Sequence, residues 1–236
     1  MLCVFATAQE SNVSEYLYIY RNGKSVRQIL LSEIDSLVFV DTTPDYEAID
    51  LGLPSGLKWA SFNVGATKPE EYGGYYAWGE IEEKKEYTWE TYKWCNGSKD
   101  SMIKYCADIY YGVVDNKAFL EPEDDVAHVE WGGNWRMPTK TEQDELRNEC
   151  TWEWTSLKDV NGYKVTGHNG NSIFLPAAGY RNGVDINYRN ECGYYWSNST
   201  GNSSNCFAYA FDLGNGYHDW ANGNRNFGQT VRPVCE

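Results

Sequence analysis

The amino-acid sequence predicts an α+β protein in which a small β unit precedes a larger domain. Three observations lead to this prediction: an Asn-Gly dipeptide between two apolar runs, one clear amphipathic helix, and many short strand-like runs separated by Gly- and Asn-rich turns. Pro44 marks a boundary, because proline interrupts regular structure. We therefore expect an N-terminal β segment over residues 9–45 and the main domain over residues 46–236.

The N-terminal segment is predicted to contain a β-hairpin over residues 16–30. Asn22 and Gly23 lie between its two apolar runs, and this dipeptide readily adopts the positive φ angles of a type I′ turn. A short helical turn around residues 32–35 and a strand over residues 37–40 would complete the unit.

The main domain has one stretch that predicts an amphipathic helix, Pro138 through Asn148. Thr139 or Thr141 can cap its start, and acidic residues in its first turns suit the positive end of the helix dipole. A second, short helix is predicted from Pro122 onward, again with acidic residues in its first turn.

The remainder of the main domain alternates short strands with turns. The runs over residues 172–176 and 206–211 have the composition of strands, and His168 lies in a Gly- and Asn-rich segment that predicts a hairpin turn. Together with the helices, these runs indicate an α+β domain with long irregular loops.

The composition favours recognition by aromatic and polar side chains. Aromatic residues make up 16% of the chain, with 10 Trp and 19 Tyr, and rings that keep a polar edge suit binding surfaces as well as cores. The formal charge of −14 and the lack of a basic run argue against a nucleic-acid partner, since such binding needs clustered Lys and Arg. No run approaches the ~20 apolar residues of a membrane-spanning helix.

Residues 1–8 resemble the end of a signal peptide. Ala6-Thr7-Ala8 before Gln9 is the small-residue pattern that signal peptidase cleaves, which predicts a secreted or cell-surface protein. Removing these residues leaves six cysteines, and an even number in an exported chain permits disulfides without determining their pairing. The six are Cys95, Cys106, Cys150, Cys192, Cys206 and Cys235.

We predict no cofactor, with calcium as an alternative. His128, His168 and His218 are not at metal-ligand spacing from one another or from a cysteine. The densest acidic cluster, Glu121 with residues 123–125, offers the oxygen atoms that calcium prefers, but the regular calcium-loop spacing is missing. We favour the interpretation that these residues begin a helix, because the helix dipole already explains acidic side chains at that position. No nucleophile-elbow or Gly-rich phosphate motif predicts an enzyme.

Nine short sequence segments follow one another along the main domain. They are YEAIDLGLPSGLKWASFNVGA (46–66), YYAWGE (75–80), WCNG (94–97), EPEDDVA (121–127), WGGNWRMPT (131–139), CTWEW (150–154), SIFLPAAGYR (172–181), GYYWSNS (193–199) and VRPV (231–234). Together they resemble the Fibrobacter succinogenes major paralogous domain family of exported proteins of gut Bacteroidetes, over about residues 46–236. That family is similar in fold to C-type-lectin-like domains, so the resemblance implies a C-type-lectin-like domain with a small N-terminal β-hairpin extension.

The resemblance also bears on the cysteines. Lectin-like domains often have a disulfide that joins a helix to the C-terminal strand. The resemblance therefore implies a disulfide between Cys150 and Cys235. The fold is also related to formylglycine-generating enzymes, which use a cysteine pair for oxidation. Without a matching motif around Cys192 or Cys206, a disulfide between neighbouring strands is the simpler interpretation of that pair.

C-type-lectin-like folds include the variable proteins of diversity-generating retroelements. In these, mutagenesis of adenine-rich codons yields Asn, Tyr, Asp, Ser, Gly and His in a C-terminal stretch, and ten Asn fall between Arg181 and Gln229 here. Tyr provides contact area and Asn provides adaptable hydrogen bonding, as in antibody paratopes. The alternative is that these Asn and Gly residues only form turns. Trp220 lies outside the mutable set and is either a fixed contact or a packing residue.

The candidate ligand-binding residues are the Asn, Tyr, His, Asp and Trp side chains of the predicted C-terminal loops. They are Asn187, Tyr188, Asn190, Asn202, Asn205, Tyr217, His218, Asp219, Trp220, Asn222, Asn224 and Asn226. The leading hypothesis is a non-enzymatic, adhesin-like or receptor-like protein that binds a protein or cell-surface ligand. One alternative is a glycan-binding module of fixed specificity. Another is a formylglycine-generating-type oxidase, which requires a free, reactive Cys192 or Cys206.

Overall fold

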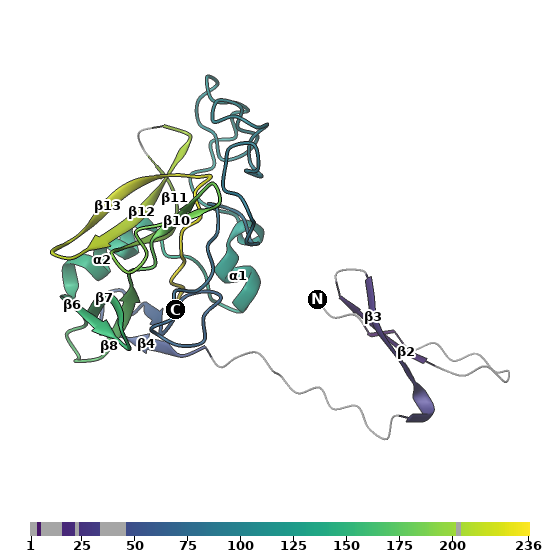
Figure 1. Cartoon of the computed structure of the whole chain (residues 1–236), viewed down its shortest axis with the longest axis horizontal. Coiled ribbons are helices and arrows are strands. Elements are labelled where there is room, and N and C mark those ends of the chain that lie inside the picture. The colour runs from purple at the N-terminus through teal and green to yellow at the C-terminus, as the bar shows by residue number, and fades with distance from the viewer. Residues whose placement is uncertain (1–3, 6–15, 22–23, 34–45, 202–203) are drawn as a thin grey trace. The chain divides into compact units, whose positions relative to one another are not determined.

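The structure is a computed structural model that describes residues 4–5, 16–21, 24–33, 46–201 and 204–236 (Figure 1). The chain divides into two compact units, Met1–Pro44 and Asp45–Glu236. Each is described here by itself. Among the described residues, no helix is long and apolar enough to cross a membrane.

The N-terminal unit is a three-stranded antiparallel sheet in the order β1-β2-β3. Its elements are β1 (Val4–Phe5), β2 (Tyr16–Arg21), β3 (Lys24–Leu30) and the 3-10 helix η1 (Leu31–Glu33). Strands β2 and β3 pair from Tyr16 with Leu30 to Arg21 with Lys24, which confirms the two strands of the predicted hairpin. The helical turn starts one residue earlier than predicted. The turn residues 22–23 and the predicted strand over 37–40 lie outside the described residues.

The larger unit is a mixed α+β domain built of small, mostly antiparallel sheets and two short helices. Its elements, in order, are β4 (Ala48–Asp50), β5 (Lys58–Ala60), η2 (Pro122–Asp124), α1 (Val126–Trp131), α2 (Lys140–Glu149), β6 (Thr151–Leu157), β7 (Val160–Thr166), β8 (Ser172–Pro176), β9 (Tyr180–Asn182), β10 (Asp185–Asn187), β11 (Cys192–Thr200), β12 (Phe207–Gly214), β13 (Tyr217–Asn224) and β14 (Val234–Cys235). The sheets of the described residues run β14-β5-β4, β6-β7-β8, β10-β9 and β11-β12-β13.

Local sequence explains where the helices begin. The Thr139 hydroxyl accepts a hydrogen bond from the Glu142 amide at 3.2 Å, and the Glu142 carboxylate accepts one from the Thr139 amide at 2.7 Å. This capping box satisfies amide groups at the start of α2, so Thr139 is the cap and the helix starts just after it. The helix predicted from Pro122 is split at Asp125, whose carboxylate caps α1 by accepting from the amides of Ala127 and His128.

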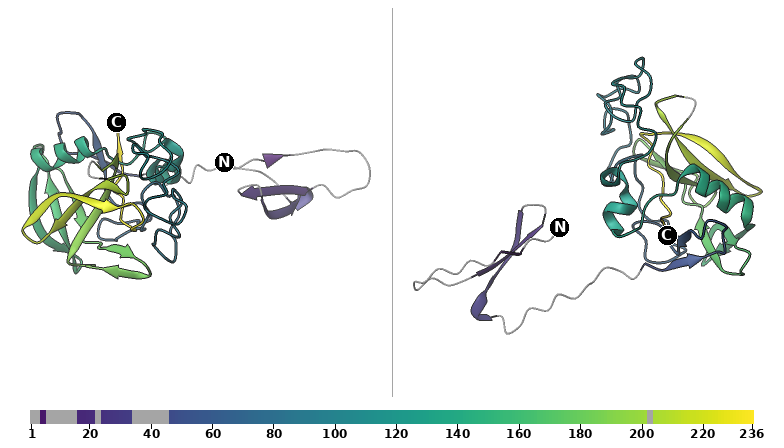
Figure 2. Two further views of the ribbon diagram at one scale, coloured as in Figure 1. Left: turned by 90° about the horizontal axis from the view of Figure 1, so that it is seen from above. Right: turned by 180° about the vertical axis from the view of Figure 1, so that it is seen from behind.

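The sheet β11-β12-β13 lies at the centre of the larger unit, with core on both of its faces (Figures 1 and 2). Tyr195, Phe211 and Leu213 pack with the β6-β7-β8 sheet and with Leu146 of α2. Trp196, with the small residues Ala208 and Ala210, packs into a second cluster that includes helix α1. Because strand side chains alternate between faces, the sheet separates these two clusters.

Residues 61–121 form a long segment without a helix or a named strand, which Figure 1 shows as irregular loops. Polar edges of buried rings hold it together. The Trp78 indole donates to the Ser197 carbonyl at 2.8 Å, the Trp94 indole donates to the Gly79 carbonyl at 2.7 Å, and the Tyr92 hydroxyl donates to the Trp78 carbonyl at 2.8 Å. Aromatic residues thus serve here as core residues that also satisfy loop backbone.

A buried arginine joins three distant segments of this unit. Arg232 is 1% exposed, and its guanidinium donates to the Asn63 side chain at 2.8 Å, the Ala60 carbonyl at 3.0 Å and the Phe174 carbonyl at 2.8 Å. Burial lowers its pKa to about 10, so it is a cation at neutral pH. No carboxylate pairs with Arg232 in the described part of the chain.

The disulfide predictions are wrong for the described structure, in which all six cysteines of residues 46–236 are free thiols. Antiparallel pairing places Cys192 opposite Gly214, at the end of β12, whereas Cys206 directly precedes the start of that strand. The length of β12 therefore separates Cys192 from Cys206. Cys150 ends α2, and Cys235 pairs with Lys58 of β5.

Candidate ligand-binding site

Six of the twelve candidate residues lie on one strand, β13, instead of in loops. Cross-strand pairing places Tyr217 opposite Gly214 and Asp219 opposite Asp212, while His218 lies opposite Leu213. Alternation along a strand sends neighbouring side chains to opposite faces. The strand therefore divides the candidates into two sets.

His218 and Trp220 pack against the body of the unit. The His218 ring stacks on Trp152 with centroids 4.4 Å apart and an interplanar angle of 12°, and burial lowers the pKa of this histidine. The Trp220 indole donates to Asp144 of α2 at 2.6 Å and lies edge-on to Phe211 at 5.6 Å. These contacts give both side chains a packing role.

The side chains of several other candidates form hydrogen bonds with backbone groups or an ion pair with a helix. The Asn190 side chain accepts from the Asn161 amide at 2.7 Å, and the Asn205 side chain accepts from the Ala107 amide at 2.6 Å. Asn226 is 3% exposed and donates to the Tyr87 carbonyl at 3.2 Å. Asp219 forms an ion pair with Arg147 of α2 at 2.6 Å. Asn202 lies outside the described residues.

Asn187 and Tyr188 lie where β10 leads into the next loop. Tyr188 has a positive φ of 56°, an uncommon backbone conformation for a bulky residue, and its side chain is 53% exposed. Its ring lies 6.1 Å from the Tyr180 ring of β9, and Asn187 pairs with Tyr180 across the β9-β10 hairpin. The hairpin thus presents an exposed aromatic residue beside a second tyrosine.

A pocket of about 160 Å³ brings some candidates together with aromatic residues that the sequence did not single out. Tyr180 is its central ring, 5.1 Å from Tyr194 of β11 and 5.2 Å from Phe227 between centroids. We call this site the tyrosine pocket, and its lining residues are Tyr180, Tyr194, Ala221, Asn222, Gly223, Asn224, Phe227 and Gln229. It is smaller than the ~300–1,000 Å³ sites of drug-sized ligands, so it suits one side chain or one sugar ring.

One feature of the tyrosine pocket points to a ligand. The Gln229 side chain is 2% exposed, and its Oε1 atom accepts no hydrogen bond from the described protein. A buried polar atom is costly unless it has a partner, so Gln229 is a ready acceptor. Gly223 lets Trp196 and Gln229 pack closely against the β13 backbone, because a Cβ there would lie 2.6 Å from the Trp196 ring and 2.5 Å from the Gln229 amide nitrogen.

A polar cluster on the same sheet contains Tyr217, Asp212 and Cys192. The Tyr217 hydroxyl lies 3.4 Å from an Asp212 carboxylate oxygen and 3.4 Å from the Cys192 thiol. Burial raises the pKa of Asp212 to about 6, and the Tyr217 hydrogen bond partly opposes this shift. Tyr217 is 44% exposed, so its ring can be reached from outside while its hydroxyl holds this cluster.

The acidic cluster at residues 121–125 is occupied by contacts within the protein. Asp124 is 2% exposed, and its carboxylate accepts from Lys104 at 2.5 Å and from the Tyr105 hydroxyl at 2.6 Å. Asp125 caps α1, and Glu121 pairs with Lys117 at 2.5 Å. Within the described ranges, no group of three or more His, Cys, Asp or Glu side chains is placed to hold a metal ion.

Sequence reasoning missed Tyr180, Tyr194, Phe227 and Gln229. Phe227 and Gln229 lie inside the 181–229 segment, in which the Asn residues were the main signal, and Tyr194 belongs to the GYYWSNS segment that supports the family resemblance. Aromatic residues in or next to a stretch rich in Asn and Gly were the available signal. Nothing in the sequence indicated that β9 and β13 line the same pocket.

Comparison with protein families shows that residues 125–234 are similar to a domain of unknown function (DUF8237). The matched region runs from the residue that caps α1 to the first residue of β14, so it contains the whole tyrosine pocket. The searches of curated proteins and of solved structures returned no match.

Proposed function

We propose that this chain is an exported, non-enzymatic binding protein that accepts a projecting group of a protein or cell-surface ligand into the tyrosine pocket. The observation that carries the proposal is the pocket itself, with three aromatic rings, two asparagines and the unpartnered Gln229 acceptor. Rigid rings with adaptable amides are the mixture that antibody paratopes use.

The resemblance to the Fibrobacter succinogenes family supports this proposal and adds the C-type-lectin-like fold to it. Asn222 and Asn224 belong to the segment whose composition fits diversity-generating-retroelement variable proteins. In this interpretation, β11-β12-β13 provides a constant frame through Trp196 and Phe211, while exposed side chains such as Tyr188 and Asn222 vary. Sequencing the gene and its neighbourhood tests this, because diversification requires a template repeat with adenine mismatches and a nearby reverse transcriptase.

Binding is tested by probing the full chain against a glycan array and an array of extracellular protein domains. Asn222 and Asn148 are both exposed, but Asn222 lines the tyrosine pocket and Asn148 lies on α2. We expect Asn222→Lys to weaken binding to the recognised array member at least tenfold and the matched Asn148→Lys to change it less than twofold. Equal effects would show that the ligand binds elsewhere.

The two arrays also separate the ligand classes. The exposed rings of Tyr188 and Tyr217 favour a glycan as second candidate, because sugar faces stack on aromatic rings. Signal on the glycan array, competed by the free sugar, would assign the pocket to a saccharide. Signal on the protein array that survives deglycosylation of the targets would assign it to a protein side chain.

A further inference from the structure

A turn in the long irregular segment exposes two large side chains next to each other. The Tyr111 amide donates to the Asp108 carbonyl at 3.0 Å, so Ile109 and Tyr110 occupy the two corners of this turn. Ile109 is 78% exposed and Tyr110 is 85% exposed, the highest values for large apolar or aromatic residues in the described part of the chain. Turn corners usually carry Gly, Pro, Asn, Asp or Ser, so these side chains are unusual there. We call residues 108–111 the apolar turn.

The apolar turn is held in place by hydrogen bonds and close packing. The Asp108 carboxylate accepts from the Tyr110 amide at 2.9 Å, and the Tyr111 carbonyl accepts from the amide of the buried Met102 at 2.6 Å. Gly112 follows the turn, and a Cβ there would clash with the Met102 carbonyl, so the backbone packs directly on Met102. The two corner side chains are therefore presented by an ordered backbone, which lowers the entropic cost of binding.

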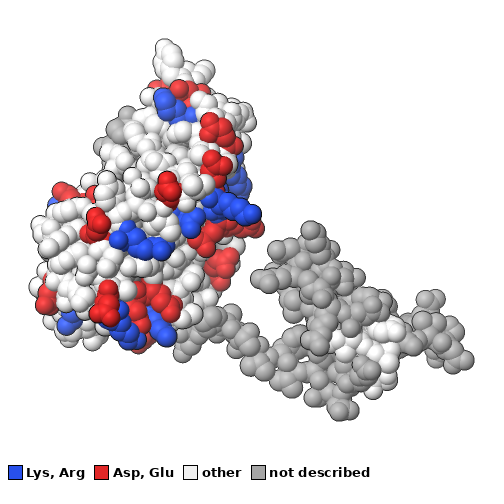
Figure 3. Space-filling model, in the orientation of Figure 1, with Lys and Arg blue, Asp and Glu red and all other residues white. Residues whose placement is uncertain are grey.

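The apolar turn lies in a part of the larger unit that projects from its body. Figure 1 shows the loops of this region, in blue-teal, projecting at the end of the unit opposite to β4 and β8, and the view from behind in Figure 2 shows the same projection. The outermost part of this end is white in Figure 3, so the side chains visible there are neither basic nor acidic. Exposed apolar side chains on a projecting end indicate an interaction surface.

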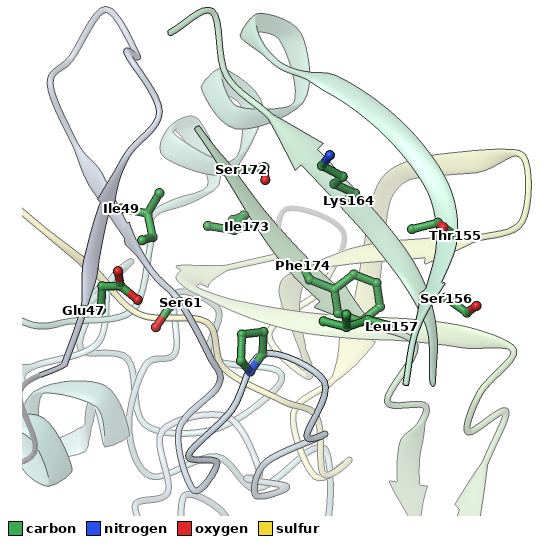
Figure 4. Close-up of a pocket in the computed structure, with 11 residues that line it drawn as sticks. Glu47, Ile49, Ser61, Thr155, Ser156, Leu157, Lys164, Ser172, Ile173 and Phe174 are labelled. Atoms are coloured by element: carbon green, nitrogen blue, oxygen red, sulfur yellow. The ribbon is translucent and has the colours of Figure 1, made fainter. Parts of the chain in front are cut away.

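A concave surface lies at the other end of the unit, over the outer face of the β6-β7-β8 sheet (Figure 4). It is a groove of about 590 Å³. Lys164 and Phe174, which pair across β7 and β8, line it, whereas their strand neighbours Val165 and Leu175 pack in the core on the opposite face. Ile49 of β4 lies on the other side of the cavity in Figure 4.

The groove fits the apolar turn in size and in apolar character. Its volume is within the ~300–1,000 Å³ of sites that hold drug-sized ligands, so it has room for the Ile109 and Tyr110 side chains together. The tyrosine pocket, of about 160 Å³, suits only one side chain. Ile49, Leu157 and Phe174 give the groove an apolar surface on which these two side chains can pack.

The charges beside the two surfaces are complementary. Asp108 belongs to the apolar turn and Lys164 lines the groove, and neither forms an ion pair within the described ranges. Glu47 lies across the cavity from Lys164 in Figure 4, so Asp108 is favoured on the Lys164 side. Because a formal charge of −14 makes copies of the chain repel one another, a local contact of opposite charges matters for association.

We infer that the apolar turn of one copy of this chain binds in the groove of a second copy. The two surfaces lie at opposite ends of the larger unit, so the contact is head-to-tail and leaves each pair of copies with one free turn and one free groove. Such a contact continues into a filament or closes into a ring. It goes beyond the proposed ligand binding and leaves the tyrosine pocket of every copy free.

Analytical ultracentrifugation of the full chain at increasing concentration tests this inference, and species larger than a dimer are expected. The turn variant, Ile109→Ser with Tyr110→Ser, removes the apolar corners and should weaken association at least about tenfold. Its control is Val184→Ser, which removes a 67% exposed apolar side chain between β9 and β10 and should change association less than about twofold.

The groove is tested by reversing the charge of Lys164. Lys164→Glu places a second acid beside Asp108 of the neighbouring copy and should weaken association at least about tenfold. Its control is Lys85→Glu, because Lys85 is also exposed and the variant has the same net charge. We expect Lys85→Glu to change association less than about twofold. Equal weakening by both variants would attribute the effect to net charge and overturn the inference.

An equimolar mixture of the turn variant and Lys164→Glu tests the pairing itself. The turn variant keeps its groove and Lys164→Glu keeps its turn, so one complementary pair of surfaces remains. We expect a dimer and no larger species, and this dimer also shows that the remaining surface of each variant is correctly folded. A mixture that forms no dimer would overturn the inference.

Other results would assign the apolar turn to a different partner. An unmodified chain that stays monomeric at every concentration overturns self-association, and flotation of that monomer with neutral phosphatidylcholine vesicles, lost in the turn variant, would assign the turn to a lipid surface. Oligomers that persist in Lys164→Glu but are lost in Asn222→Lys would place the turn in the tyrosine pocket instead of the groove. Oligomers that persist in the turn variant would show that another surface joins the copies.

Discussion

Removal of the buried Arg232 side chain is expected to destabilise the larger unit severely. In Arg232→Met, the Asn63 side chain and the Ala60 and Phe174 carbonyls each lose their donor. An unsatisfied buried acceptor costs about 1–3 kcal/mol, and removal of the desolvated cation recovers part of that cost. The net expectation is a loss of about 3–5 kcal/mol in the free energy of unfolding.

Urea denaturation followed by tryptophan fluorescence measures this change, and a fall in Tm of roughly 10 °C should accompany it. The matched control is Arg147→Met, which breaks only the ion pair with the exposed Asp219 and should cost less than about 1 kcal/mol. Arg232→Lys keeps the charge but not the planar fork that serves three acceptors, so an intermediate loss is expected. If Arg232→Met were as mild as Arg147→Met, the reasoning about these three hydrogen bonds would be refuted.

Three further predictions concern the helix, the polar cluster and the pocket. Thr139→Ala removes the cap of α2 and should cost about 1 kcal/mol in urea denaturation, with Thr141→Ala as a control of little effect. Asp212 has a folded pKa raised to about 6, so its charge destabilises the folded state above pH 6, and this penalty fades as the pH falls toward the ordinary value of 3.8. Asp212→Asn should therefore raise the free energy of unfolding by about 1–2 kcal/mol at pH 7.5, after allowance for solvent screening, and by nothing measurable at pH 4. An equal gain at both pH values would exclude the buried charge of Asp212 as the cause. Gly223→Ala places a methyl group against Trp196 and Gln229 and should cost about 1–3 kcal/mol in the free energy of unfolding, so an unchanged urea midpoint would contradict this close packing.

Charge on the surface follows a pattern that composition alone does not show. Figure 3 shows Lys and Arg side chains lying among Asp and Glu on the visible face of the larger unit. Ion pairs of this unit include the i,i+4 pairs of Lys117 with Glu121 at 2.5 Å and of Lys140 with Asp144 at 2.8 Å. Exposed pairs of this kind contribute little to stability individually.

The candidate site could be predicted only in part because a strand position does not reveal which face is buried. Asn222 lines the tyrosine pocket, whereas Asn226, four residues on, is buried and holds the Tyr87 backbone. His218 and Tyr217 are adjacent in sequence, yet one stacks on Trp152 and the other is exposed. Residue type alone assigned all four to the ligand.

The sequence by itself determined those features whose contacts lie within a few residues. The capping box of Thr139 and Glu142 and the strand over residues 172–176 were readable because their hydrogen bonds or side-chain preferences are local. Only the tertiary structure decided that Cys192 and Cys206 are separated by the length of β12, that Arg232 joins Ala60 to Phe174, and that Tyr180 meets Phe227. Those contacts depend on which strands become neighbours, and that choice follows from burial of the whole core instead of from any short stretch of residues.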